Sequence, residues 1–159
     1  MKNNHRWKRE DILRLSLYRK LSLREQKYII EKYNSYSDIL QHPPEYFESK
    51  YKGIFDNDKK TRIDFDDLLK KLEKENIDYV TYYDENYPEL LREIYYAPLI
   101  LFYKGQLYNG FNQIAIVGTR RNTLYGKMTT EKIVEELVRN QIIVVSGLAY
   151  GIDSIAHRE

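Results

Sequence analysis

The sequence predicts an α/β protein of two parts: a small helical domain over residues 1–64 and a truncated parallel-sheet domain over residues 65–159. Three observations support this prediction. Most of the glycines lie in the last third of the chain, whereas all four prolines precede it. Apolar residues in the first part recur at helical spacing. Two short apolar runs, Ile114–Val117 and Ile142–Val145, bracket one amphipathic segment, which is typical of parallel strands joined by a helix.

Helices are expected throughout the first sixty residues. The segment Glu10–Lys20 carries its leucines and isoleucine at mostly helical spacing. Ser22, followed three residues later by Glu25, predicts a capping box and the start of a second helix. Shorter helices are expected at Ser37–Leu40 and, after two prolines, at Glu45–Lys50. Together these segments predict a small helical bundle.

The second part alternates between helix and strand. The expected elements are, in order, a helix at Asp64–Asn76, a strand at Ile77–Tyr83, a helical turn at Tyr87–Ala97, a buried strand at Pro98–Tyr103, a strand at Ile114–Val117, a helix at Met128–Asn140 and a strand at Ile142–Val145. A last helix begins near Asp153, and the chain stops inside it at Glu159. We therefore expect apolar side chains of the last two strands to be partly exposed.

The composition argues against several classes of protein. There is no cysteine, so neither a disulfide framework nor a thiolate metal site is expected. No apolar run reaches the length of a membrane span, and the charged start is unlike a secretory signal. These features predict a cytoplasmic protein without a membrane partner. No nucleophile–base pair, paired carboxylates or metal-ligand cluster is evident. A non-enzymatic binding protein without cofactor or metal is therefore expected.

Charge is distributed unevenly along the chain. The formal net charge is +2, but residues 1–35 carry ten Lys/Arg against four Asp/Glu. Such a basic block can attract phosphate backbones. It is equally compatible with a solvated helical face, and both interpretations stay open.

The loop Gly118–Gly126 is the main candidate for a phosphate site, because it follows an apolar strand and leads into a helix. A glycine at a strand end allows close approach to the backbone, while hydroxyls and forked guanidinium groups match phosphate oxygens. The residues of these types are Gly118, Thr119, Arg120, Arg121, Thr123 and Gly126. The spacing fits neither a dinucleotide fingerprint nor a Walker loop. The alternative is an ordinary tight turn with solvated arginines, which is preferred for Arg121, whereas phosphate binding is preferred for Arg120.

The second loop begins at Ser146 and holds two glycines, Gly147 and Gly151. Glycines four residues apart suit a sharp turn that aims backbone N–H groups outward and makes a nest for an anion. We expect Asp153 to cap the following helix rather than to catalyse a reaction. His157, one turn later, is expected to be structural.

These motifs resemble those of the DprA/Smf family of DNA-processing proteins. That family carries a Val-Gly-Ser/Thr-Arg loop, a Thr/Ser-x-Tyr-Gly helix start and a Ser-Gly-x-Ala-x-Gly-Ile-Asp-x-x-Ala-His segment, and all three occur here in order, ending at His157. The resemblance covers about residues 65–159. The first sixty residues match only as a small helical domain, and the turn Tyr18–Ser22 lacks the glycines of the family's hairpin.

The resemblance implies an extended Rossmann-like domain preceded by a SAM or helix-hairpin-helix-like domain. It implies single-stranded DNA binding and delivery of that DNA to the RecA recombinase during natural transformation, the competence pathway of DNA uptake and recombination. It further implies a homodimer in full-length members, built by segments beyond residue 159, so that DNA binding is expected to be impaired in this chain. The implied contacts are Gly118, Thr119, Arg120, Ser146, Gly147, Leu148, Ala149 and Gly151.

Two alternatives stay open. One is a nucleotide-processing Rossmann-like enzyme of the phosphoribohydrolase kind, whose glycine-rich loop and glutamate would have to lie beyond residue 159. The other is a non-functional truncation product that keeps the motifs without a stable site.

Overall fold

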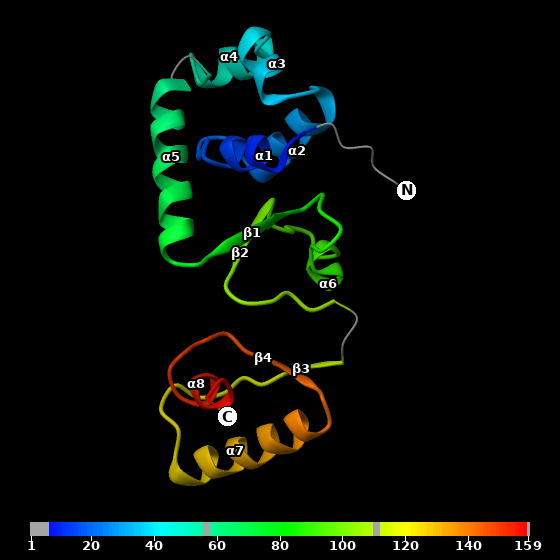
Figure 1. Cartoon of the computed structure of the whole chain (residues 1–159), viewed down its shortest axis with the longest axis vertical. Coiled ribbons are helices and arrows are strands. Elements are labelled where there is room, and N and C mark those ends of the chain that lie inside the picture. Colours follow the sequence, from blue (N-terminus) through cyan, green and yellow to red (C-terminus); the bar gives the residue numbers. More distant parts are fainter. Residues whose placement is uncertain (1–6, 56–57, 110–111, 159) are drawn as a thin grey trace. The chain divides into compact units, whose positions relative to one another are not determined.

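The computed structural model describes residues 7–55, 58–109 and 112–158, which form two compact units, Met1–Asn109 and Gly110–Glu159 (Figure 1). The predicted α/β class is confirmed, since helices alternate with two small sheets. No helix within the described ranges has the length and apolar character needed to cross a membrane.

Five helices open the first unit. They are α1 (Arg9–Ser16), α2 (Leu23–Lys32), α3 (Tyr36–Gln41), α4 (Glu45–Tyr51) and α5 (Asp58–Lys74). The predicted capping box is confirmed: the Ser22 hydroxyl accepts the Glu25 N–H at 3.3 Å, and the Glu25 carboxylate accepts the Ser22 N–H at 2.8 Å. The α4 helix begins directly after Pro44, as the two prolines predict.

The core of the first unit lies on both sides of α1. Ile12 and Leu15 pack among buried side chains of α2, α3 and α4, such as Ile29. On the other side, Leu13 packs with Phe65 and Leu72 of α5. Complete burial of one such side chain contributes about 1.5–3 kcal/mol to the stability of the folded unit. Because α1 supplies side chains to both clusters, it is the central element of the unit.

An antiparallel hairpin completes the first unit. Its strands are β1 (Asp78–Thr81) and β2 (Ile100–Tyr103), in the register Asp78↔Tyr103, and the short helix α6 (Glu89–Arg92) lies between them in sequence. The predicted strand at 98–103 exists, but its expected burial is wrong. Phe102 is exposed because a two-stranded sheet leaves part of each face uncovered. The hairpin packs with the helices, so the compact units divide at residue 110, and the boundary expected at residue 64 falls inside α5.

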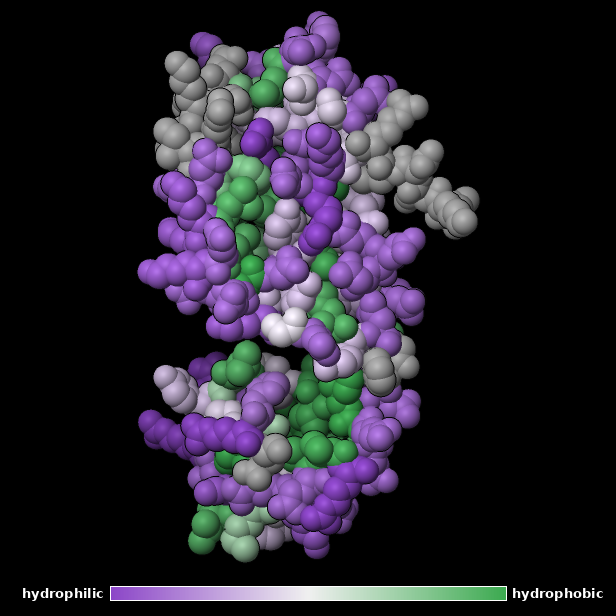
Figure 2. All heavy atoms as spheres, viewed as in Figure 1, coloured by the Kyte–Doolittle hydropathy of each residue, from purple (hydrophilic) through white to green (hydrophobic). Residues whose placement is uncertain are grey.

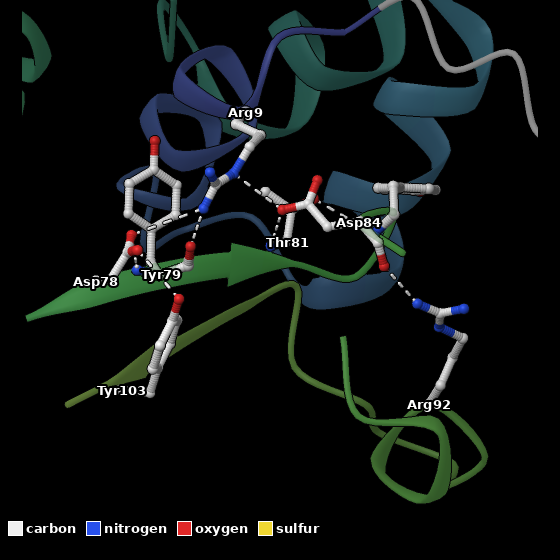
Figure 3. A network of polar contacts seen from close by, with 8 residues as sticks. Arg9, Asp78, Tyr79, Thr81, Asp84, Arg92 and Tyr103 are labelled. Atoms are coloured by element: carbon white, nitrogen blue, oxygen red, sulfur yellow. Dashed lines mark hydrogen bonds and ion pairs between the residues drawn. The ribbon is translucent and has the colours of Figure 1, made fainter. Parts of the chain in front are cut away.

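A polar network joins the hairpin to α1 (Figure 3). The Arg9 guanidinium pairs with the Asp84 carboxylate at 2.9 Å and donates to the Tyr79 carbonyl, with the Tyr79 ring beneath it. The Tyr103 hydroxyl donates to the Asp78 carboxylate at 3.0 Å, and Arg92 donates to the Asp84 carbonyl at 2.7 Å. One helix, both strands and α6 are therefore joined by side chains that are far apart in sequence.

The second unit is a β–α–β–α arrangement. It contains β3 (Gln113–Ala115), α7 (Leu124–Arg139), β4 (Ile143–Val145) and α8 (Ile152–Ala156). The two strands pair in parallel, with Gln113 opposite Ile143 and Ala115 opposite Val145. The predicted parallel, adjacent strands are therefore confirmed.

Apolar surface remains on the second unit. Ile114 of β3 and Val145 of β4 are 42% and 44% exposed, and Ile133 and Val138 of α7 are also exposed. Figure 2 shows apolar atoms gathered on one face of this unit, over β3, β4 and α7. The expected partial exposure of the strand side chains is confirmed.

Candidate nucleic-acid interface

Two loops leave the carboxyl ends of the paired strands. The first loop (residues 116–123) runs from β3 to α7, and the second loop (residues 146–151) runs from β4 to α8. Because the strands are parallel, both loops leave the same edge of the sheet. This edge is where open α/β sheets bind ligands.

Cationic side chains of the first loop face solvent. Arg120 and Arg121 are both exposed. Within the described part of the chain, neither guanidinium has a hydrogen-bond or ion-pair partner, whereas the Arg139 guanidinium at the far end of α7 pairs with Glu135 at 3.4 Å. The two loop arginines are therefore available to an external anion.

The hydroxyls of the first loop shape the backbone. The Thr119 hydroxyl accepts the Arg121 N–H at 3.2 Å, and the Thr123 hydroxyl caps α7 by accepting the Gly126 N–H at 3.1 Å. In the described residues, the first two amides of α7, on Leu124 and Tyr125, have no acceptor. Such amides carry the positive end of the helix dipole and favour negative charge.

Asp153 links the two loops. Its side chain is buried, with one carboxylate oxygen accepting the Gly118 N–H at 3.3 Å and the other accepting the Gly147 N–H at 3.1 Å. The expected role as helix cap is wrong: Asp153 lies within α8, whose N-cap is Gly151 without a side-chain cap. The carboxylate is instead the anion that the amides of both loops enclose.

The ionisation of Asp153 follows from these contacts. Burial favours the neutral acid, but hydrogen bonds from the Gly118 and Gly147 amides outweigh it. They lower the pKa of Asp153 below its ordinary value. Asp153 therefore holds both loops together as a carboxylate at neutral pH.

The glycines allow the two loops to touch. Gly151 has φ +86°, and a Cβ there would lie 2.2 Å from the Thr119 carbonyl oxygen. A Cβ on Gly118 would lie 2.7 Å from the Ile152 side chain. Gly118 was expected to let a ligand approach the backbone, but its missing side chain makes room for Ile152. The Ile152 N–H also donates to the Thr119 carbonyl at 3.2 Å.

The remaining predicted residues occupy different environments. Leu148 is exposed and has φ +54°, in the left-handed region, whereas Ser146 and Ala149 are partly buried. His157 is exposed at the end of α8. Between residues 7 and 158, apart from the gaps named above, no three His, Asp or Glu side chains gather as a metal site.

Sequence reasoning missed Ile152 and Asp153 as the residues that join the loops. It also gave no role to the rings of Tyr125 and Tyr150, which are 79% and 86% exposed. Part of the signal for Asp153 was in the sequence, because an acid near two glycines can accept hydrogen bonds from their amides, and it needs such donors once it is buried. Its partner Gly118 is 35 residues away, and only the parallel strand pair brings the two together.

The chain is similar to known proteins. The family described as DNA recombination-mediator protein A matches residues 78–159. The chain is 47% identical over 75 residues to DNA processing protein DprA of Streptococcus pneumoniae, which is 46% of this chain and 26% of that protein. It is 40% identical over 95 residues to Protein Smf of Synechocystis, which is 57% of this chain and 24% of that protein.

A solved structure shows the same fold. The X-ray structure of DprA from Streptococcus pneumoniae matches 95% of this chain and 48% of its own, with 28% identity and a TM-score of 0.51. The chain thus spans about half of that structure, and its alignments cover about a quarter of the two curated relatives named above.

Proposed function

Since this chain belongs to the DNA recombination-mediator protein A family, we propose that its two strand-end loops bind single-stranded DNA. The observation that carries the proposal is the first loop. It combines two exposed guanidinium groups without partners in the described residues and two open amides at the start of α7. These are the groups that bind phosphate oxygens.

The two loops have different roles in this proposal. Arg120 and Arg121, with the α7 amides, contact backbone phosphates. The second loop supports them, because Asp153 already engages the amides of Gly118 and Gly147. The second loop then contributes its shape and those backbone groups that do not contact Asp153.

The proposal includes a role in recombination. The family description names a recombination mediator, and the Streptococcus pneumoniae relative is named DNA processing protein DprA. We infer that the bound strand is handed to a RecA recombinase during natural transformation, in the cytoplasm, by a homodimer of the full-length protein. Binding rather than catalysis is proposed, because Asp153, the one buried acid at the described strand ends, is held by backbone amides and has no base beside it.

The test is fluorescence anisotropy with a labelled oligo-dT over a series of salt concentrations, using the 159-residue chain. A charge-assisted hydrogen bond contributes about 1.5–3 kcal/mol, so Arg120→Ala should weaken binding by roughly tenfold to a hundredfold. The salt slope should become shallower by about 0.7 for each phosphate of the single strand that the variant no longer neutralises. The weakening should not depend on base sequence, because phosphate contacts carry no sequence information.

The matched control is Arg139→Ala. It removes the same charge from the far end of α7, where Arg139 pairs with Glu135. Affinity and salt slope should change little in this variant. Equal effects of the two substitutions would mean that general charge, rather than the first loop, binds DNA, and would contradict the proposal.

A further inference from the structure

Two tyrosines of the second unit are exposed almost entirely. Tyr125 is 79% exposed and Tyr150 is 86% exposed, and neither ring contacts another aromatic ring within the described ranges. Most tyrosines of the first unit lie against other rings or cations, as Tyr82 does with Tyr83 and Lys27. A large apolar ring left in water has surface available for a partner.

The second loop holds Tyr150 outward. Leu148 and Gly151, on either side of it, have φ +54° and +86°, so the chain turns sharply before and after the ring. The Gly147 amide is fixed by Asp153, and a Cβ on Gly151 would lie 2.8 Å from the Arg120 Cα. Tyr150 is therefore presented from a braced loop, one residue from the backbone contact with Arg120.

Tyr125 is held near the same place from the other side. It belongs to the first turn of α7, which the Thr123 hydroxyl caps. The next residue, Gly126, lies close to the residue that follows the second loop, since a Cβ there would lie 3.5 Å from the Ile152 Cδ1. The loop that holds Arg120 thus touches the segment of Tyr150 through Gly151 and leads directly into the helix turn that carries Tyr125.

We propose that Tyr125 and Tyr150 stack on unpaired bases of the strand whose phosphate Arg120 binds. This inference rests on the proposed function and names the form of its ligand, a single strand with its bases turned outward. Aromatic stacking changes affinity by roughly fivefold to a hundredfold per base and tolerates every base. It requires bases that are free to leave a duplex stack, so the two tyrosines select single-stranded over double-stranded DNA.

The experiment compares three ligands of equal length: oligo-dT, an abasic oligomer with the same phosphates, and a dT·dA duplex. The wild-type chain should bind oligo-dT most tightly. Tyr150→Ala and Tyr125→Ala should each weaken oligo-dT binding by roughly fivefold to a hundredfold. Both should leave binding to the abasic oligomer unchanged. Tyr150→Phe keeps the ring and should behave as wild type.

The controls separate this inference from the proposed function. Tyr96→Ala removes a tyrosine of the first unit that is 72% exposed and should change neither affinity. Arg120→Ala should weaken oligo-dT and abasic binding alike, and if it changes neither, the proposed function fails. If Arg120→Ala weakens both while the tyrosine variants keep the wild-type ratio of oligo-dT to abasic affinity, stacking alone is overturned. A wild-type chain with no preference for oligo-dT would overturn it as well.

Discussion

The two strand-end loops hold similar positions but expose different groups. Each has a glycine shortly after an apolar strand, and each precedes a helix. A glycine amide of each loop meets the carboxylate of Asp153, but only the first loop also presents guanidinium groups, those of Arg120 and Arg121, to solvent. Glycine spacing therefore predicts that amides will face an anion, but it does not say whether that anion is a ligand or a side chain of the same chain.

The largest expected effect is on the contact between the loops. Gly151→Ala combines a left-handed backbone with a Cβ 2.2 Å from the Thr119 carbonyl oxygen, so we expect it to destabilise the second unit by about 3 kcal/mol. Hydrogen exchange over residues 112–158 measures this, with residues 7–55 as an internal reference.

The control is Gly105→Ala. Gly105 has φ +89° but nothing within 4 Å of a Cβ, so its substitution isolates the backbone strain. It should destabilise the first unit, to which Gly105 belongs, by about 1 kcal/mol. If the two alanine variants cost the same, the loops do not depend on close contact at Gly151.

A smaller effect is expected from Asp153→Asn. One carboxylate oxygen becomes an amide group, so an N–H donor faces the N–H of Gly118 or Gly147. The amide that loses its acceptor, on Gly118 or Gly147, should exchange with solvent roughly tenfold faster. Amide-resolved exchange measured by NMR would show it, and unchanged protection of both amides would remove Asp153 from its linking role.

Acid should reproduce this loosening in the wild-type chain. The pKa of Asp153 is lowered from 3.8 in the folded state, so its contribution is present above that pH and is lost as the pH falls through the lowered value. Asp153→Asn should abolish the acid-induced change in the second unit.

Glu25 of the first unit offers an internal comparison. Burial opposes its ionisation, but hydrogen bonds from Lys50, Ser22 and Tyr51 lower the pKa of Glu25 to about 2. The first unit should therefore lose its Glu25 contribution between pH 4.5 and about 2 in both proteins.

The smallest effect concerns the start of α7. Thr123→Ala removes the helix cap and should cost about 1 kcal/mol, whereas Thr123→Ser keeps the hydroxyl and should cost little. Thermal unfolding of these variants tests the capping role of Thr123, and anisotropy on the same samples tests whether Thr123 also contacts DNA. A loss of DNA affinity much larger than the loss of stability would mean that Thr123 also touches the ligand.

Local signals predicted much of the fold. The capping box at Ser22, the helix after Pro44 and the parallel pairing of the two apolar runs all follow from short stretches of sequence. The site was harder, because its decisive contacts join residues that are distant in the chain. Asp153 meets Gly118 only after the strands pair, and Gly151 fits against Thr119 only when both loops have formed. The sequence therefore identified the two loops but did not show which of their groups contact Asp153 and which face solvent.

The arginine at the start of α1 has a consequence for how such proteins exchange parts. The family model matches residues from 78 onward, yet the hairpin that starts there is anchored by Arg9 through Asp84. The range that the family model matches and the border of packing, which falls at residue 110, are therefore different. A hybrid that took its first 77 residues from a relative would leave Asp84 without its cation, unless the donor supplied a matching one. Such a hybrid is thus constrained by a pair of side chains, Arg9 and Asp84, that lie on opposite sides of residue 78.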